Sequence, residues 1–383
     1  MDAALDREEP ASLPAAPPVV VDASGPATSP QLQAQLEAGV AAEVVSELSP
    51  LQKANAARAK ATKEGRSIIE GTKRFASDDR AESWRHLAVV IGVIGGATVV
   101  AAMAPWWPLR LAAAVVSGLS TVRLFIVYHD FMHGALLRGS KVANVILSAY
   151  GVLVLAPPRI WKESHNYHHA HAGQIVGSQI GSFPVVTLQM WKKMKAADRI
   201  KYRVFRNPVT ILLGYVPIFM LGMCISSVRK APLKYWDSAL ALIVNWALTA
   251  ILVTQFGFTT AAFVYLLPLA ISCATGAYLF YAQHNFPDMQ LQPRHEWTFA
   301  KAALESSSYM PMGPVMRWFT GNIGYHHVHH LNPQIPFYKL PIAMAEVPAL
   351  QNPGITSLKP WDVARCLGLK LWDAEARRMV GYP

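Results

Sequence analysis

Residues 238–283 read SALALIVNWALTAILVTQFGFTTAAFVYLLPLAISCATGAYLFYAQ, and these 46 residues contain no Asp, Glu, Lys or Arg. At a rise of 1.5 Å per residue they would form about 69 Å of helix, which is enough for two crossings of a hydrocarbon core about 30 Å thick. The natural turn lies at residues 255–258, Gln-Phe-Gly-Phe. The stretch therefore predicts a helical hairpin in a membrane, with spans at about 238–255 and 258–281.

The composition of the whole chain agrees with this prediction. Of its 383 residues 52% are hydrophobic and only 15% are charged, whereas soluble domains carry about 25% charged residues. So much apolar material excludes a wholly disordered chain. The three cysteines, Cys224, Cys273 and Cys366, are odd in number and far apart, which excludes a disulfide scaffold.

Two further apolar blocks, at about 86–107 and 111–128, each have the length of one crossing. They are joined by residues 105–110, Pro-Trp-Trp-Pro-Leu-Arg, whose tryptophans suit a membrane interface. Arg123 falls near the end of the second block, and we expect its side chain to snorkel to the membrane surface.

Two other apolar blocks are expected to lie in or on the membrane without crossing it. Residues 142–156 are too few for a span, and they end at two prolines. Residues 207–228 are long enough, but they contain Pro208 and Pro217 and have basic residues on both sides, whereas a crossing segment has its basic loop mainly on the cytoplasmic side. We interpret this block as re-entrant or interfacial.

The expected fold is therefore an all-α integral membrane protein with four transmembrane helices in two hairpins, interfacial helices and a cytoplasmic, histidine-rich part. Residues 1–60 are rich in Ala and Pro and predict a disordered arm. Residues 61–85 predict a juxtamembrane helix, and 346–383 a cytoplasmic tail. With both termini in the cytoplasm, much of the net charge of +11 flanks the spans, so it indicates orientation rather than nucleic-acid binding.

The chain has 13 histidines, and most of them fall in three clusters. His129-Asp-Phe-Met-His133 places two at i and i+4; His165-Asn-Tyr-His-His169 and His326-His-Val-His-His330 each place three at i, i+3 and i+4. On a helix these spacings put the rings on one face, where they can bind a metal ion together. Chance would give about 0.015 triplets of the H-x-x-H-H form in a chain of this composition, and this chain has two.

A shared metal site requires the clusters to lie on one side of the membrane. Three apolar blocks separate the second cluster from the third. Three crossings would place these clusters on opposite sides, and two would bring them together. The non-crossing interpretation of residues 207–228 and a joint metal site therefore support each other.

Three such histidine clusters around two membrane hairpins resemble the membrane fatty acid desaturase superfamily, over about residues 86–345. The stretches Tyr281-Ala-Gln-His-Asn-Phe286 and 318–336, WFTGNIGYHHVHHLNPQIP, are similar to bacterial acyl-lipid desaturases of the methyl-end type. The resemblance implies oxidation of a fatty acyl lipid with two non-haem Fe ions, O2 and electrons from a separate ferredoxin- or cytochrome-type donor. It also implies an integral membrane location, which we expect to be a bacterial inner membrane.

The resemblance carries nine metal ligands onto this chain: His129, His133, His165, His168, His169, His284, His326, His329 and His330. It supplies no catalytic side chain beyond them. To orient the ligand rings we expect the nearby polar residues Asp130, Glu163, Asn166 and Asn322. His171 and His327 lie off the shared faces and are expected beside the ligands rather than among them.

The sequence is also compatible with other functions. A hydroxylase, an alkane monooxygenase or a carotenoid ketolase could use the same scaffold, and a double bond without inserted oxygen would distinguish the desaturase. A histidine-rich membrane transporter belongs to a different class and predicts ionisable residues within the spans.

Overall fold

The structure is a computed structural model that describes residues 50–178 and 180–383. The arm predicted for residues 1–60 lies outside the described residues up to residue 49. Helix α2 (Pro50–Thr72) and the short 3-10 helix η1 (Lys73–Phe75) occupy most of the remaining N-terminal region. They contain part of the stretch for which a juxtamembrane helix was predicted.

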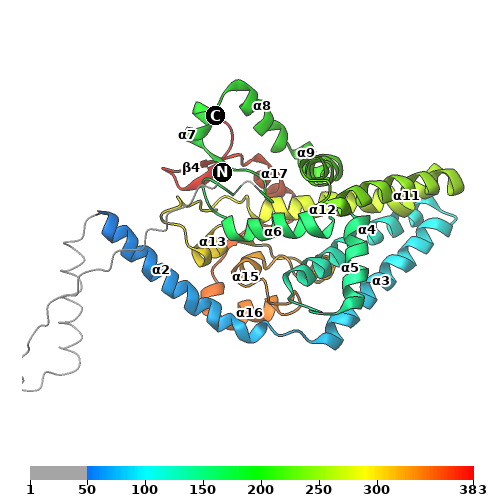
Figure 1. The fold of residues 1–383 in the computed structure, drawn as a ribbon, viewed down its shortest axis with the longest axis horizontal. Helices are drawn as coiled ribbons and strands as arrows, with labels where there is room; N and C mark the ends of the chain where they lie inside the picture. The colour runs from blue at the N-terminus through cyan, green and yellow to red at the C-terminus, as the bar shows by residue number, and fades with distance from the viewer. Residues whose placement is uncertain (1–49, 179) are drawn as a thin grey trace, which may run out of the picture. The chain divides into compact units, whose positions relative to one another are not determined.

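The first long helices, α3 (Arg80–Met103) and α4 (Trp107–His133), lie side by side (Figure 1). Asp79 caps α3, because its carboxylate accepts a hydrogen bond from the Glu82 amide at 3.0 Å. At the turn, Arg110 Nε of α4 donates to Ala101 O of α3 at 2.7 Å. Both helices are long and apolar enough to cross a membrane, and they occupy the region of the first predicted hairpin.

The uncharged stretch folds back on itself at Gly257. Helix α11 (Trp236–Ala261) continues through the π-helical segment η3 (Ala262–Leu266) into α12 (Leu267–Gln283), but Gly257 has φ 79° and ψ 157°, which is not helical. Tyr265 Oη donates to Asn245 Oδ1. A straight helix would hold these residues about 30 Å apart. The chain therefore turns back on itself at Gly257, which lies within the predicted turn at residues 255–258.

The two other apolar blocks, residues 142–156 and 207–228, lie between the hairpins in the sequence. Helix α5 (Lys141–Leu153) meets α6 (Pro158–His171) at an angle of 88°, the geometry of a broken span or a re-entrant loop. Residues 207–228 form α9 (Pro208–Leu212), the π-helical segment η2 (Tyr215–Ile225) and the start of α10 (Ser226–Lys230). Among the described residues, three helical stretches are long and apolar enough to cross a membrane: α3, α4 and Trp236–Gln283 taken as a whole. The bent pair of α5 and α6 adds a fourth if it forms one span.

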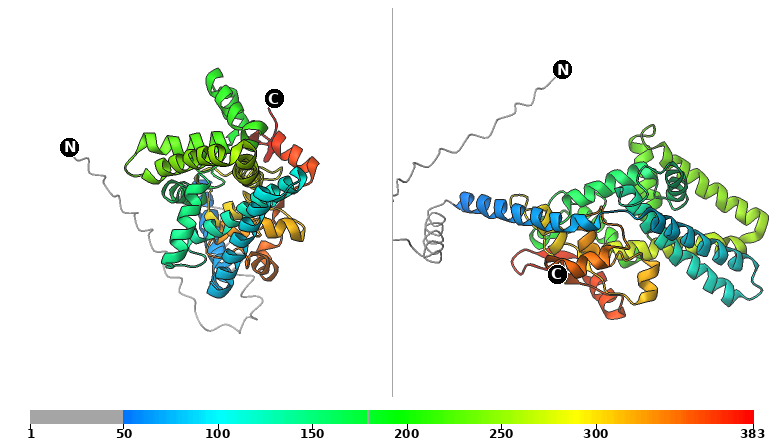
Figure 2. Two further views of the ribbon diagram at one scale, coloured as in Figure 1. Left: turned by 90° about the vertical axis from the view of Figure 1, so that its right-hand side faces the viewer. Right: turned by 90° about the horizontal axis from the view of Figure 1, so that it is seen from below.

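The remaining elements gather at the end of the long helices that carries the histidines (Figure 2). They are α7 (Leu188–Lys193), α8 (Ala196–Phe205), α13 (Phe299–Glu305), α14 (Pro314–Phe319), α15 (His326–Leu331), α16 (Leu340–Glu346), η4 (Pro348–Leu350) and α17 (Pro360–Gly368).

The fold is mostly helical, but the all-α expectation is wrong in one detail. A three-stranded sheet has the order β1–β4–β5, formed by Val186–Thr187, Leu371–Asp373 and Arg378–Val380. A parallel pair joins β2 (Ser308–Tyr309) to β3 (Gly354–Ile355). Strands of two or three residues are too short for alternation to be visible in the sequence.

Residues 346–383, expected as a tail, include strands and a helix that pack onto the rest of the chain. Arg206 is fully buried and donates to the carbonyl of Leu369, to Tyr281 Oη at 3.1 Å and to Asn285 Oδ1. Lys370 donates to the carbonyl of Arg206. These bonds join the C-terminal strands to the end of α12.

Arg123 does not snorkel to the surface. It is 4% exposed, donates to the carbonyl of Trp318 and lies 4.5 Å from the centre of the Trp318 ring. Its second amino group lies 3.1 Å from His86 Nδ1. The end of α4 is covered by the segment before the third histidine cluster, so a buried carbonyl and ring are the partners of Arg123.

The turn at Gly257 generates a testable prediction. Its backbone angles are essentially restricted to glycine, so Gly257→Ala should lower the free energy of unfolding by about 1–3 kcal/mol. Gly92→Ala is the control, since Gly92 lies within helix α3 and an added Cβ there would meet nothing within 4 Å. Thermal unfolding in detergent, followed by tryptophan fluorescence, measures both. Equal stability of the two variants would contradict a strained turn.

Candidate metal centre

The first two histidines occupy the last turn of α4. Gly134, with φ 71°, ends the helix in the left-handed region, and its N–H bonds to Phe131 O at 2.9 Å. His129 and His133 therefore stand one turn apart at the C-terminal end of a long apolar helix, with ring centroids 4.7 Å apart. The histidine pair is held where α4 leaves the apolar region.

Helix α6 presents the second cluster. It begins at Pro158, where a missing N–H costs nothing, and the Arg159 amide donates to Asp237 Oδ2 of α11 at 2.9 Å. His165, His168 and His169 are all buried on this helix. The ring of Trp161, one turn earlier, stacks on His165 with centroids 4.5 Å apart.

The last four histidines come from two segments far apart in sequence. His284 directly follows α12, and its Nδ1 lies 2.8 Å from the carbonyl of Ser306. His326, His329 and His330 belong to the six-residue helix α15. Left-handed backbone at Gly321 and Asn322 shortly precedes α15.

The structure brings all nine predicted histidines together, in two groups. The five-histidine group consists of His129, His133, His165, His169 and His329, and the four-histidine group of His168, His284, His326 and His330. Within each group, one ring nitrogen per residue lies within 4.8 Å of every other. Either group could therefore hold one metal ion.

The distances within the groups have the scale of metal coordination. The Nε2 atoms of His129 and His165 lie 3.0 Å apart, as do those of His168 and His284. Two imidazole nitrogens about 2.1 Å from one ion, at right angles, would be separated by about 3.0 Å. The residues present fit two metal ions, and imidazole suits Fe, Zn, Cu and Ni.

Burial keeps these rings neutral, which is the form that binds metal. It lowers the pKa of His284 to about 4, although the bond to Ser306 O opposes the shift. It also lowers the pKa values of His326, His329 and His330 well below the usual range, with nearby histidines acting in the same direction. Metal ions binding at neutral pH would therefore displace few protons.

Four polar residues were expected to orient the rings, and of these Asp130 is the one that contacts a ligand histidine. Its Oδ1 lies 2.9 Å from His129 Nδ1, and its Oδ2 accepts from the Phe337 amide at 2.7 Å. Glu163 instead forms an ion pair with Lys234 at 2.6 Å. Asn322 donates to Phe337 O, and Asn166 is exposed.

His171 and His327 lie outside both groups. His171 stacks on Tyr167 and lies 2.9 Å from its carbonyl. His327 is fully buried, with Nε2 3.0 Å from Leu350 O. The contact between the Ser306 carbonyl and His284 was not predicted, because a residue of any type can supply a backbone carbonyl.

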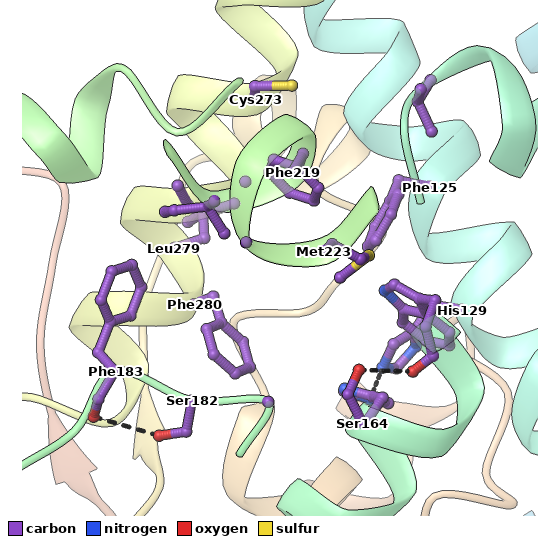
Figure 3. Close-up of a pocket in the computed structure, with 18 of the residues that line it drawn as sticks. Phe125, His129, Ser164, Ser182, Phe183, Phe219, Met223, Cys273, Leu279 and Phe280 are labelled. Carbon is purple, nitrogen blue, oxygen red and sulfur yellow. Dashed lines mark hydrogen bonds between the residues drawn. The ribbon is translucent and has the colours of Figure 1, made fainter. Parts of the chain in front are cut away.

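A largely apolar cavity of about 400 Å³ adjoins both groups. His129 and His165 of the five-histidine group and His326 of the four-histidine group lie in its wall. Figure 3 places Cys273 toward one end of the cavity and Ser182, Phe183 and His129 toward the other. The histidines thus border a space suited to an apolar ligand.

A second, much smaller pocket of about 20 Å³ reaches the four-histidine group alone. Its wall includes His168, His284, Ser178 and Ser306. Ser182 and Phe183 line both this pocket and the large cavity. By volume it can hold about one water molecule.

The sequence model of the fatty acid desaturase family matches residues 104–356, a range that contains all nine clustered histidines. The chain belongs to this family. It is therefore an oxidoreductase, and its two histidine groups are compatible with a di-metal site.

Individual relatives agree with the family assignment of this desaturase. It is 31% identical to "Fatty acid desaturase" of Bacillus subtilis (strain 168), over 72% of this chain and 78% of the relative. It is 28% identical to "sn-1 acyl-lipid omega-3 desaturase (ferredoxin)" of Nostoc sp. (strain 36), over 57% and 61%. For "sn-1 oleoyl-lipid 12-desaturase" of Synechocystis sp. (strain ATCC 27184 / PCC 6803 / Kazusa) the identity is 20%, over 69% and 75%.

The division into two groups predicts selective loss of metal. His168→Ala should empty the four-histidine group and leave the five-histidine group loaded, because His168 contributes to only one of them. Elemental analysis of the purified desaturase measures metal per chain. His171→Ala, outside both groups, should retain the wild-type content. If both variants kept the full content, His168 would not be a ligand.

The Asp130 carboxylate should strengthen metal binding by the five-histidine group. Asp130→Ala leaves two buried donors without their acceptor, and loss of such a partner typically weakens metal binding about 10–100-fold. Metal retained after dialysis against graded chelator concentrations measures the effect. Asn166→Ala, next to His165 but exposed, should dialyse like the wild type. Equal retention in Asp130→Ala and the wild type would show that the contact does not support the site.

Proposed function

We propose that this desaturase introduces a cis double bond into the acyl chain of a membrane lipid, with two non-haem iron ions, O2 as co-substrate and electrons from a separate donor protein. One observation carries the proposal: histidines of both groups lie in the wall of one apolar cavity. An acyl chain in that cavity would pass the metal centre directly.

The nine histidines would hold the iron ions, and bound iron would supply the O2 chemistry that removes two hydrogens from an unactivated methylene pair. The residues of the chain bind and orient the substrate. Phe125, Phe219 and Met223 present apolar side chains to the cavity (Figure 3). Such walls exclude water and fix one pair of methylenes near the histidines.

Asp130 and the carbonyl of Ser306 would fix the orientation of His129 and His284, since each lies within hydrogen-bond distance of Nδ1. The Nε2 atom of each ring then faces its group. Held this way, the rings need not reorganise when the metal binds. In this arrangement no side chain has to act as a general base toward the substrate.

For the topology we propose four crossings, formed by α3, α4 and the two arms of the hairpin at Gly257, with residues 86–345 as the desaturase domain. Residues 142–156 and 207–228 would be re-entrant or interfacial. Both termini and the histidines would then face the cytoplasm of a bacterial inner membrane. The exposed basic residues of α7, of α8 and of the link between them support this orientation: Lys192, Lys193, Lys195, Lys201 and Arg203.

For the electron donor we propose a ferredoxin- or cytochrome-type protein. The name of the Nostoc relative includes ferredoxin. The same basic residues of α7 and α8 would favour an acidic partner.

Product analysis tests the reaction. Expression in a host that lacks polyunsaturated lipids should yield a new double bond without inserted oxygen, mapped by mass spectrometry of derivatised fatty acids. His326→Ala, which removes a ring shared by the cavity wall and the four-histidine group, should yield none while inserting normally into the membrane. A hydroxylated product from the wild type would assign the chain to the hydroxylases instead.

A further inference from the structure

The large cavity follows one face of α12. Its wall includes residues of this helix from Ser272 to Gln283, a distance of about 16 Å along the helix axis. His284 of the four-histidine group comes directly after Gln283. The cavity therefore extends from the metal centre along α12, toward the N-terminal half of that helix.

The residues that line the cavity differ in exposure. Ile180 and Phe205 are 54% and 55% exposed, and neither belongs to a candidate membrane span. Val122, Tyr150 and Cys273, elsewhere in the wall, are buried in the main core. An acyl chain in a bilayer has its carboxyl end at the interface and its methyl end deep in the hydrocarbon core. The methyl end would thus point from the histidines toward Ser272.

Gly276 lies in the wall between these points, eight residues before His284. This corresponds to about 12 Å along the helix. A Cβ added at Gly276 would meet no heavy atom within 4 Å, whereas a Cβ at Gly118 would lie 2.8 Å from the carbonyl of Pro268. A side chain at position 276 therefore has room to occupy without displacing the protein around it, and that room adjoins the cavity.

We propose that Gly276 determines how long an acyl tail this desaturase accepts beyond the reacting bond. The inference rests on the proposed function, which places an acyl chain in the cavity. A glycine leaves the full width of the cavity open at this level. A larger side chain would stop the tail about 12 Å from His284.

Ser272 provides a second level on the same helix. It lies four residues before Gly276 and also lines the cavity. One turn of helix is about 5.4 Å, the length of about four methylene groups. A block at position 272 should therefore admit tails about four methylenes longer than a block at position 276.

The experiment compares Gly276→Leu and Ser272→Leu with the wild type, in cells supplied with saturated fatty acids of graded length. Conversion of the longest chains by Gly276→Leu should fall about tenfold or more, while conversion of the shortest chains stays near the wild-type level. Ser272→Leu should show its cut-off about four methylenes later. Retained conversion of short chains shows that each variant is folded and loaded with metal.

The control is Ala270→Leu, on the same helix but exposed and outside the cavity wall, and its length profile should match the wild type. If Gly276→Leu loses activity on all lengths, Gly276→Ala distinguishes misfolding from blocking: a smaller shift in the same direction supports the proposal. An unchanged length profile in Gly276→Leu would overturn it. Absence of any new double bond from the wild type would instead refute the proposed function.

Discussion

The structure depends on one constraint: nine neutral imidazoles must meet within a few ångströms in a buried place. One nitrogen of each ring lies within 4.8 Å of those of the others in its group, although the histidines come from α4, α6, α15 and the residue after α12. This requirement determines where the histidine-bearing helices end. α4 ends at Gly134, and α12 ends immediately before His284. Buried rings without charge tolerate such crowding, whereas protonated rings would repel one another.

The same constraint joins the membrane part to the rest of the chain. Helix α4, which carries two of the histidines, and the stretch Trp236–Gln283, which directly precedes His284, are candidate membrane-spanning segments. Helix α15 is a short helix in the region that covers their ends. Bonds at the junction keep these parts in register: Arg123 with the carbonyl of Trp318, Asp130 with Phe337, and Arg206 with Asn285. Polar groups buried at such a junction are costly unless paired. Pairing them across segments therefore fixes how the segments meet.

Much of this organisation was accessible from the sequence. The absence of charge predicted the hairpin and its turn near Gly257, and the i, i+3, i+4 spacing predicted which eight histidines converge, with His284 added by the family resemblance. The missed features depend on backbone groups and distant partners. Ser306 acts through its carbonyl, Glu163 is drawn to Lys234 at 2.6 Å, and the strands of residues 346–383 pair with segments far away in the sequence. No pattern within a short window contains this information.

The position of Ser182 and Phe183 between two cavities has a consequence for how molecules could reach the histidines. These two residues separate an apolar cavity of about 400 Å³ from a small, partly polar pocket of about 20 Å³, and both border the four-histidine group. An apolar chain and a small polar molecule could thus lie near different histidines of the same group without sharing one compartment. With an acyl chain in the larger cavity, as proposed, the smaller pocket would still be free to take up a small molecule.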